Sequence, residues 1–376
     1  MKPRGLMIIH HFRPGSAGGA ELQAERLAKQ LVQLGHPIQV LTRLTAPGAL
    51  PEETADGVQI HRVPYLLPYW ITRDNADTFQ YLVRQRHTYD LLHAHLAFGH
   101  AVVAVVAARC LGKKAIVKIA CAGEYGDLCL FSKFAGFAAA LKVLHQADAV
   151  VAISREVERE LLQYGFPAHR IVRIPNGVDT DFFRRTQPMP ERGKTQFILI
   201  GRRHPQKGID TTLLAAQRLL AQGLGDQFEI RLYGADYAEH DYRALARDLG
   251  VVEHVRFFPF ERDIRAVYHS AHCFLLPSRG EGMSNSLLEA MALELPVIAT
   301  PVSGTPDVVD DGVDGVLVPP DAPAALAAAM ARVIADPAFA HQLGQRARRK
   351  VETQFALPRV AQQYSELYSR LCAAEA

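Results

Sequence analysis

Short apolar runs alternate with stretches of helical periodicity along the whole chain. In the first half, a helix is predicted over residues 20–34, because Leu27, Leu31 and Leu34 share one face and Gly35 provides a natural stop. Buried strands are predicted over residues 6–10, 38–42, 91–94, 115–119, 149–153 and 170–174. Buried strands separated by helices are typical of a parallel α/β sheet.

The second half repeats this plan from residue 197 onwards. Strands are predicted over residues 197–200, 229–233, 255–257, 273–276, 297–299 and 315–318. The predicted helices cover residues 209–222, 241–249, 284–292 and the alanine-rich stretch 322–335. We therefore expect an α/β protein with two doubly wound parallel sheets.

A turn signal and a linker separate the two halves. Pro175-Asn176-Gly177 is a strong turn sequence, and residues 187–193 form a polar, proline-bearing linker, so the boundary falls in this region. The expected domains are residues 1–180 and 181–357. The last segment, residues 358–376, needs a partner surface, because it carries an apolar stripe at helical spacing that consists of Val360, Tyr364, Leu367 and Leu371.

Composition narrows the class of protein. A length of 376 residues suits two domains, and 49% hydrophobic and 22% charged residues are typical of a soluble globular protein. The longest apolar run, residues 101–108, falls far short of the roughly 20 residues of a membrane-spanning helix. Five cysteines without a C-x-x-C pair argue against a disulfide framework or a zinc site and favour a reducing cytoplasm.

Charge is unevenly distributed between the halves. The first 180 residues carry 20 Lys and Arg against 15 Asp and Glu, whereas the whole chain has a net charge of only +3. This basic excess suits an anionic small molecule or a membrane surface. It is too weak to predict nucleic-acid binding.

Two loops that follow predicted strands have the composition of anion-binding loops. The first brings Gly18 and Gly19 to a helix start, where glycine lets the backbone approach a diphosphate; a plain tight turn explains them equally well. Its spacing is not G-x-G-x-x-G and no acid for a ribose follows the second strand, so we discount a nicotinamide enzyme. The second loop, residues 201–208, holds Arg202 and Lys207, which suit a leaving diphosphate better than a solvated surface.

A third loop, residues 278–292, is the most informative. Ser284, Asn285 and Ser286 begin a predicted helix whose N–H groups can bind a phosphate. Glu281 precedes this helix and Glu289 lies within it. Carboxylates beside a phosphate are unfavourable unless they accept hydrogen bonds, which sugar or ribose hydroxyls supply. The combination predicts a nucleotide-sugar site.

At these residues the chain resembles glycosyltransferase family 4, whose members have the GT-B architecture of two facing Rossmann-like domains. The resemblance spans nearly the whole chain and is carried by residues 18–21, 175–179, 201–208, 281–289 and 296–300, which lead to Gly304. It implies a retaining transferase without metal or cofactor that uses a UDP-sugar or GDP-sugar. The first domain would bind the acceptor, the second the donor, and the terminal helix would cross back to the first.

The resemblance also implies roles for individual residues. Arg202 and Lys207 would hold the donor diphosphate, Glu281 would bind the donor sugar, and Glu289 would bind the ribose. The predicted catalytic set consists of Glu281, Arg202, Lys207 and Lys118. The predicted donor-binding residues are Gly18, Gly19, Pro259, Met283, Ser284, Asn285, Ser286, Leu287, Glu289 and Gly304.

One departure from the family concerns a cleft histidine that many members carry after the strand matching residues 115–119. This chain has no histidine there, and we hypothesise that Lys118, Glu124 or Asp127 contacts donor or acceptor instead; a purely structural role is the alternative. His93 and His95 end another strand. The missing third ligand favours a cleft wall over a metal site, with His95 near the substrate.

Phe131, Phe134 and Phe137 lie between Lys133 and Lys142 and predict either an amphipathic helix at a membrane surface or ordinary core packing. A sugar or lipid-linked acceptor is therefore expected, together with a location in the cytoplasm or at the inner face of the membrane. The function would be cell-surface polysaccharide or glycolipid synthesis. A nucleotide-sugar epimerase and an inactive donor-binding paralogue remain the alternatives.

Overall fold

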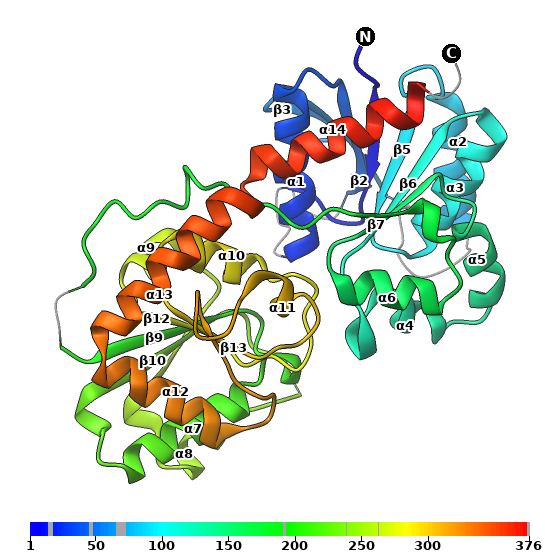
Figure 1. The fold of residues 1–376 in the computed structure, drawn as a ribbon. Helices are drawn as coiled ribbons and strands as arrows, with labels where there is room; N and C mark the ends of the chain where they lie inside the picture. Colours follow the sequence, from blue (N-terminus) through cyan, green and yellow to red (C-terminus); the bar gives the residue numbers. More distant parts are fainter. Residues whose placement is uncertain are drawn as a thin grey trace. The chain divides into compact units, whose positions relative to one another are not determined.

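The structure is a computed structural model that describes residues 1–13, 18–44, 48–64, 73–190, 193–237, 239–261 and 263–373. These residues form two compact units, each built on its own sheet (Figure 1). The first unit comprises Met1–Gly177 and Leu357–Ala376, and the second comprises Val178–Ala356.

The first unit contains an eight-stranded sheet in the order β3-β4-β2-β1-β5-β6-β7-β8. Every described strand pair is parallel except β3 with β4. The sequence analysis missed this hairpin because β3 is a short edge strand whose residues alternate between exposed and half-buried. The strands are β1 (Gly5–Ile8), β2 (Ile38–Arg43), β3 (Glu52–Ala55), β4 (Val58–Val63), β5 (Leu91–His95), β6 (Lys114–Ile119), β7 (Ala149–Ala152) and β8 (Ile171–Arg173).

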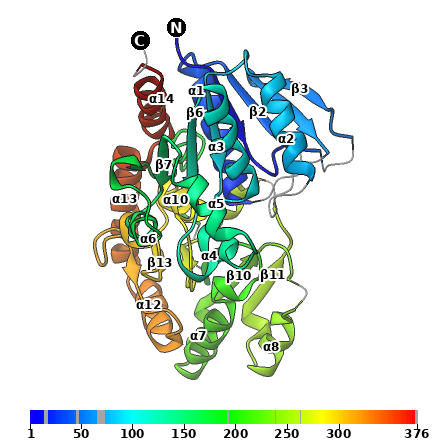
Figure 2. The same cartoon turned by 90° about the vertical axis from the view of Figure 1, so that its right-hand side faces the viewer.

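Helices cover this sheet, which explains why β1, β5 and β7 are buried along their whole length. Helices α2 and α3 lie side by side, as Figure 2 shows. The helices are α1 (Gly19–Gln33), α2 (Arg73–Arg84), α3 (Gly99–Leu111), α4 (Asp127–Ser132), α5 (Phe137–Leu144), α6 (Arg155–Gln163) and α14 (Leu357–Ala373).

The terminal helix α14 packs beside α1 in the first unit (Figure 1). Val360, Tyr364 and Leu367 of the predicted apolar stripe are buried in one core cluster with residues of β1, β2 and α1, and Leu371 packs against that cluster half-buried. Burial of apolar surface contributes about 25 cal/mol per Å² to stability, so burying this stripe favours packing of the helix on the first unit. The predicted crossing back to the first domain is confirmed.

The second unit contains a six-stranded parallel sheet in the order β11-β10-β9-β12-β13-β14. Its strands are β9 (Thr195–Ile200), β10 (Phe228–Tyr233), β11 (Val255–Phe258), β12 (Cys273–Leu276), β13 (Val297–Ala299) and β14 (Val316–Leu317). Its helices are α7 (Ile209–Ala221), α8 (Tyr242–Asp248), α9 (Ile264–His269), α10 (Asn285–Ala292), α11 (Thr305–Val308), α12 (Pro323–Ala335) and α13 (Pro337–Lys350). Helices α7 and α12 lie side by side (Figure 2).

Both sheets have a topological switch point beside their first strand. In the first unit β1 lies between β2 and β5, and in the second unit β9 lies between β10 and β12. Ligands of open α/β sheets bind at the carboxyl ends of the strands that flank such a point. The loops after β1, β5, β9 and β12 are therefore the places to look for a site.

The first unit ends at Gly177, close to the expected boundary between residues 180 and 181 and ahead of the linker at residues 187–193. The intervening segment belongs to the second unit because its residues are bonded there. The Val178 N–H donates to the carbonyl of Phe355 over 2.9 Å, and the buried Phe183 ring packs edge-on against Tyr268.

The predicted amphipathic helix through Phe131, Phe134 and Phe137 is wrong. Helix α4 ends at Ser132 and α5 begins at Phe137, because the chain turns at Gly136 with φ of +87°. Phe131 is buried against the rings of Phe98 and Phe137, so this side chain serves core packing. No single helix in the described ranges is long and apolar enough to cross a membrane; α12 and the longer helical stretch after it pass that test only as a pair bent by 103°.

Candidate functional site

The loops after β9 and β12 are packed tightly against each other in the second unit. Gly208 has φ of +62°, and a Cβ atom there would lie 2.0 Å from the carbonyl oxygen of Pro277, so the contact requires glycine. The Gly304 N–H donates to the carbonyl of Gly282 over 2.8 Å, which ties the turn after β13 to the same place. Met283, which follows Gly282, is buried.

Lys207 and Glu281 form an ion pair where these loops meet. Nζ of Lys207 lies 2.5 Å from Oε1 of Glu281, and the Ser278 hydroxyl donates to the same oxygen over 2.7 Å. The lysine side chain is 18% exposed and the glutamate side chain 8%. The carboxylate therefore neutralises the lysine at the position where a donor phosphate is expected.

Arg279 braces the two loops from one side. Its guanidinium donates to Asp210 and to Asp321, each over 2.7 Å. Its backbone N–H donates to the carbonyl of Gln206, whose side chain donates in turn to the carbonyl of Gly280. Charge-assisted bonds of this kind fix the loops that carry Lys207 and Glu281 relative to each other.

Helix α10 begins beside the ion pair and contains Glu289. Ser284 caps the helix by accepting the N–H of Leu287 over 3.3 Å. Glu289 is 5% exposed, and the Tyr268 hydroxyl lies 3.0 Å from its Oε2. Because that hydroxyl also lies 3.1 Å from the backbone oxygen of Ser286, its single hydrogen is shared between two acceptors. Tyr268 therefore helps to orient the buried carboxylate of Glu289.

The two arginines after β9 have different environments. Arg202 is exposed and forms no ion pair with the part of the chain that the structure describes. Arg203 is buried, pairs with Asp236 at 2.5 Å and donates to the carbonyl of Phe258 over 2.9 Å. It therefore supports the backbone that leads to the exposed Pro259, where the base is expected, and leaves Arg202 as the cation facing solvent.

In the first unit, the glycine loop is described only from Gly18 onwards, since residues 14–17 lie outside the described ranges. Gly18 is the N-cap of α1 and Gly19 its first residue. A Cβ atom at Gly18 would lie 2.0 Å from a carboxylate oxygen of Glu21, which therefore folds back over the helix start.

Lys118 lies near the carboxyl end of β6 and is 4% exposed. Its Nζ donates to Oδ1 of Asn176 over 3.0 Å and lies 5.9 Å from the centre of the Tyr364 ring. Burial lowers the pKa of Lys118 to about 8. The lysine is therefore held by a neutral amide and an aromatic face.

His93 and His95 are buried in β5 with their rings stacked 4.3 Å apart. His93 Nδ1 lies 2.8 Å from the Tyr368 hydroxyl, and His100 Nε2 lies 2.6 Å from the His95 carbonyl. Burial lowers the pKa of His93 to about 3 and that of His95 well below its usual range, so both are neutral near pH 7. Within the described ranges, no group of three or more His, Cys, Asp or Glu side chains is placed to hold a metal ion.

Asp127 and Glu124 occupy contrasting positions in the loop after β6. Asp127 is buried at the start of α4, where its carboxylate accepts the Ala120 N–H over 3.0 Å; burial nevertheless raises its pKa to about 7. Glu124 is exposed on a short 3-10 turn. The structure thus gathers Lys118, His95 and Asp127 at one edge of the first sheet and leaves Glu124 in solvent.

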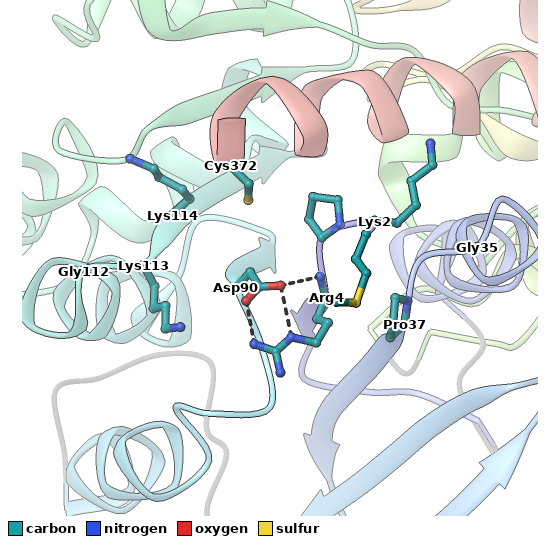
Figure 3. Close-up of a pocket in the computed structure, with 11 residues that line it drawn as sticks. Lys2, Arg4, Gly35, Pro37, Asp90, Gly112, Lys113, Lys114 and Cys372 are labelled. Atoms are coloured by element: carbon teal, nitrogen blue, oxygen red, sulfur yellow. Dashed lines mark hydrogen bonds and ion pairs between the residues drawn. The ribbon is translucent and has the colours of Figure 1, made fainter. Parts of the chain in front are cut away.

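A hollow of about 760 Å³ in the first unit lies at the opposite edge of the sheet. Figure 3 shows Arg4 and Asp90 at its centre, joined by hydrogen bonds of 2.7 to 3.1 Å. Arg4 precedes β1 and Asp90 precedes β5, so this hollow opens at the amino ends of the strands. Its central charges are already paired, and we exclude it from the candidate site.

Sequence reasoning missed the partners of the site residues. Ser278 was recognised as part of a loop but not as a donor to Glu281, and nothing in the sequence around Tyr268 pointed to Glu289. Asn176 was assigned only to a turn. A partial signal existed for Asn176, because the Pro175-Asn176-Gly177 turn follows a strand and so returns to the ligand-binding edge.

Two family models match the chain in sequence. The model described as Glycosyltransferase Family 4 matches residues 17–182, and the model described as Glycosyl transferases group 1 matches residues 181–350. The D-inositol 3-phosphate glycosyltransferase of Kineococcus radiotolerans is 30% identical and covers 95% of this chain and 91% of its own. The N-acetyl-alpha-D-glucosaminyl L-malate synthase of Bacillus anthracis is 25% identical, with 94% of both chains covered.

Solved structures show the same fold. Sucrose-phosphate synthase of Thermosynechococcus elongatus superimposes with a TM-score of 0.82 at 22% identity over 100% of both chains. HepE of Anabaena, solved with UDP and glucose, superimposes with a TM-score of 0.80 at 20% identity over 98% of this chain and 99% of its own. The predicted GT-B architecture is thereby confirmed.

Proposed function

We propose that this chain, which belongs to the family 4 and group 1 glycosyltransferases, transfers a sugar from a nucleotide-diphosphate donor to an acceptor hydroxyl with retention of configuration. Membership makes it a glycosyltransferase. The donor, the stereochemistry and the acceptor are the parts of this statement that need testing.

The proposal rests on one observation: Lys207 and Ser278 both bond to the Glu281 carboxylate at the switch point of the second unit. A nucleotide sugar presents a diphosphate beside sugar hydroxyls. A lysine suits the first group and a buried carboxylate suits the second. Without ligand, Lys207 and Glu281 neutralise each other. When the donor binds, Lys207 can turn to the diphosphate and Glu281 to the sugar hydroxyls, so that neither charge is left buried and unpaired.

We assign donor contacts along the edge of the second sheet. Lys207 and the exposed Arg202 hold the diphosphate, together with N–H groups at the start of α10. Glu289 accepts ribose hydroxyls and Glu281 accepts hydroxyls of the sugar. The base lies near Pro259. Support for a UDP-sugar comes from HepE, which was solved with UDP and glucose, and a GDP-sugar is the alternative to test.

Retention follows if the acceptor hydroxyl attacks from the face that the diphosphate leaves. Lys207 and Arg202 would stabilise charge that develops on the leaving oxygens, where fixed cations contribute most. A departing phosphate oxygen then accepts the proton of the incoming hydroxyl. The protein supplies the cations itself, so we propose that no metal or cofactor takes part.

Relatives support a hydroxyl acceptor, since one is named for D-inositol 3-phosphate and another for L-malate. We retain the proposal that the acceptor is a sugar or lipid-linked molecule met at the cytoplasmic face of a membrane. Leu130, Lys133 and Lys142 are exposed on or between α4 and α5 and offer a surface for it. Flotation with anionic and with neutral liposomes tests this contact, and absence of binding to both contradicts it.

The experiment for the reaction is a panel of UDP-, GDP- and ADP-sugars with hydroxyl acceptors, read by nucleotide release. We expect one UDP-sugar or GDP-sugar to release nucleotide in an acceptor-dependent manner, with unchanged rate in EDTA. The anomeric coupling in the proton NMR spectrum of the product should match that of the donor. An inverted product contradicts retention, and a rate lost in EDTA contradicts metal independence.

The same panel distinguishes the alternatives. An epimerase converts the donor without acceptor, and a donor-binding paralogue binds nucleotide without turnover. The complete set of Arg202, Lys207, Glu281 and Glu289 argues against a paralogue that has lost activity.

A further inference from the structure

The chain passes between its two units at two neighbouring positions, Gly177–Val178 and Ala356–Leu357. Within the first unit, a Cβ atom at Gly177 would lie 3.0 Å from Cα and Cδ1 of Leu357, so the two crossings leave this unit in close contact. Within the second unit, Val178 pairs with Ala356 as an isolated β-bridge. The turn at Asn176 and Gly177 therefore determines where both crossings start.

Gln23 of α1 holds this turn by its backbone. Its Nε2 donates to the Gly177 carbonyl over 2.7 Å, and its Oε1 accepts the Gly177 N–H over 3.2 Å. Gln23 is 3% exposed, so both bonds are shielded from water. The same helix begins at Gly19, one turn earlier.

Lys118 of β6 holds the same turn by its side chain, through the 3.0 Å bond from Nζ to Oδ1 of Asn176. No described carboxylate lies within ion-pair distance of this ammonium group. A buried charge whose hydrogen-bond partner is a neutral amide destabilises the folded chain, so stability alone does not explain it.

We propose that Lys118 and Gln23 are positioning residues of the transfer reaction, which hold the Asn176–Gly177 turn against the ligand-binding edge of the first sheet. The inference rests on the proposed function. The hydrogen bonds of Lys118 and Gln23 join the end of β6, the first turns of α1 and the Asn176–Gly177 turn into one assembly. Displacing a positioned group by about 1 Å can lower turnover about 100-fold, so loosening the assembly should affect kcat more than nucleotide affinity.

The ammonium group gives this assembly a pH dependence. Charge-assisted hydrogen bonds are stronger than neutral ones, so the bond to Asn176 weakens as Lys118 deprotonates above about pH 8. The groups that face Lys118 come from four elements: His93 and His95 of β5, Asp127 of α4, Tyr364 of α14 and Asn176 of the turn. Between pH 8 and 9 the histidines stay neutral, Asp127 stays charged and Tyr364 stays protonated, so Lys118 is the member that titrates.

The test compares kcat across pH 6–10 for full-length wild type and three variants at the assembly. Lys118→Met should lower kcat about 10- to 100-fold and remove the alkaline decline. Lys118→Arg, which keeps charge and donors, should restore at least a third of kcat without a decline below pH 10. Asn176→Asp should move the decline up by at least one pH unit, because a carboxylate favours the ammonium form.

Two controls separate positioning from general damage. Gln23→Met should lower kcat about 10-fold while leaving the decline near pH 8, because Lys118 is intact. Lys194→Met removes an exposed lysine and should match wild type. UDP binding by calorimetry should stay within threefold throughout.

Two results in an otherwise active enzyme would overturn this inference and leave the proposed function standing. The first is full kcat in Lys118→Met, and the second is an alkaline decline that Asn176→Asp does not move. A wild type that transfers sugar from no donor overturns the proposed function first. If Lys118→Met fails to fold, the pH profile of Asn176→Asp still decides the question.

Discussion

The ligand-binding edges of the two units place a lysine in opposite surroundings. Lys207 in the second unit is partly exposed and contacts a carboxylate at 2.5 Å, whereas Lys118 in the first unit is 4% exposed and contacts an amide. The first arrangement balances charge and remains accessible to a phosphate. The second leaves a buried cation with no described carboxylate within ion-pair distance, although Asp127 acts on it from farther away. We therefore propose different tasks for the two lysines, phosphate binding in the second unit and positioning in the first.

The largest effect on turnover is expected at Glu281, the carboxylate that pairs with Lys207. Glu281→Gln should lower turnover about 10²- to 10³-fold, or about 3–4 kcal/mol, because a hydrogen-bond acceptor for the transferred sugar is lost. UDP affinity should hold or rise, since Lys207 no longer shares its charge with a carboxylate. Steady-state kinetics and UDP calorimetry measure the two quantities. Glu253→Gln, at an exposed glutamate of the same unit, is the matched control; a parallel loss of UDP affinity would contradict the assignment.

A smaller effect, on stability, is expected at Asp127 in the first unit. Its pKa is raised from 3.8 to about 7, so the folded chain holds an extra proton between these values, and this group's contribution falls as pH rises through them. Between pH 5 and pH 7.5 the change integrates to roughly 2.5 kcal/mol. Asp127→Asn should remove it, so wild type should lose stability relative to the variant between pH 5 and pH 7.5. Urea unfolding at both pH values measures this, and an equal difference at the two would refute it.

Tyr268→Phe should have a still smaller effect in the second unit. It removes the hydroxyl 3.0 Å from the buried carboxylate of Glu289, which costs about 1–2 kcal/mol. We expect roughly 10-fold weaker UDP binding, because Glu289 is then less firmly oriented toward the ribose. Calorimetry with UDP measures it. Tyr125→Phe, at a half-buried tyrosine of the first unit, controls for loss of a hydroxyl elsewhere.

The smallest effect is expected at Glu124, which the sequence analysis offered as a substitute for the family histidine. Because its side chain is exposed on a 3-10 turn, Glu124→Gln should change kcat and acceptor KM less than twofold. Kinetics with a saturating donor measure both. A tenfold change in either quantity would instead indicate that Glu124 contacts the substrate.

Local pattern made much of the fold predictable. The apolar runs at residues 6–10 and 197–200 overlap β1 and β9, since buried parallel strands are continuous apolar segments. The aromatic run after residue 130 misled because its spacing fits a helix. A glycine turn at Gly136 interrupts that helix, and spacing alone does not reveal it.

The sequence by itself determined the two α/β units and pointed to the loop residues of the candidate donor site, because strand periodicity, glycine turns and helix caps are local features of the chain. Only the tertiary structure decided the partners. Lys118 meets Asn176 across 58 positions, and Lys207 meets Glu281 across 74. Which side chains meet over such separations depends on how strands and helices pack. The same packing therefore set which lysine is paired with a carboxylate and which is buried beside an amide.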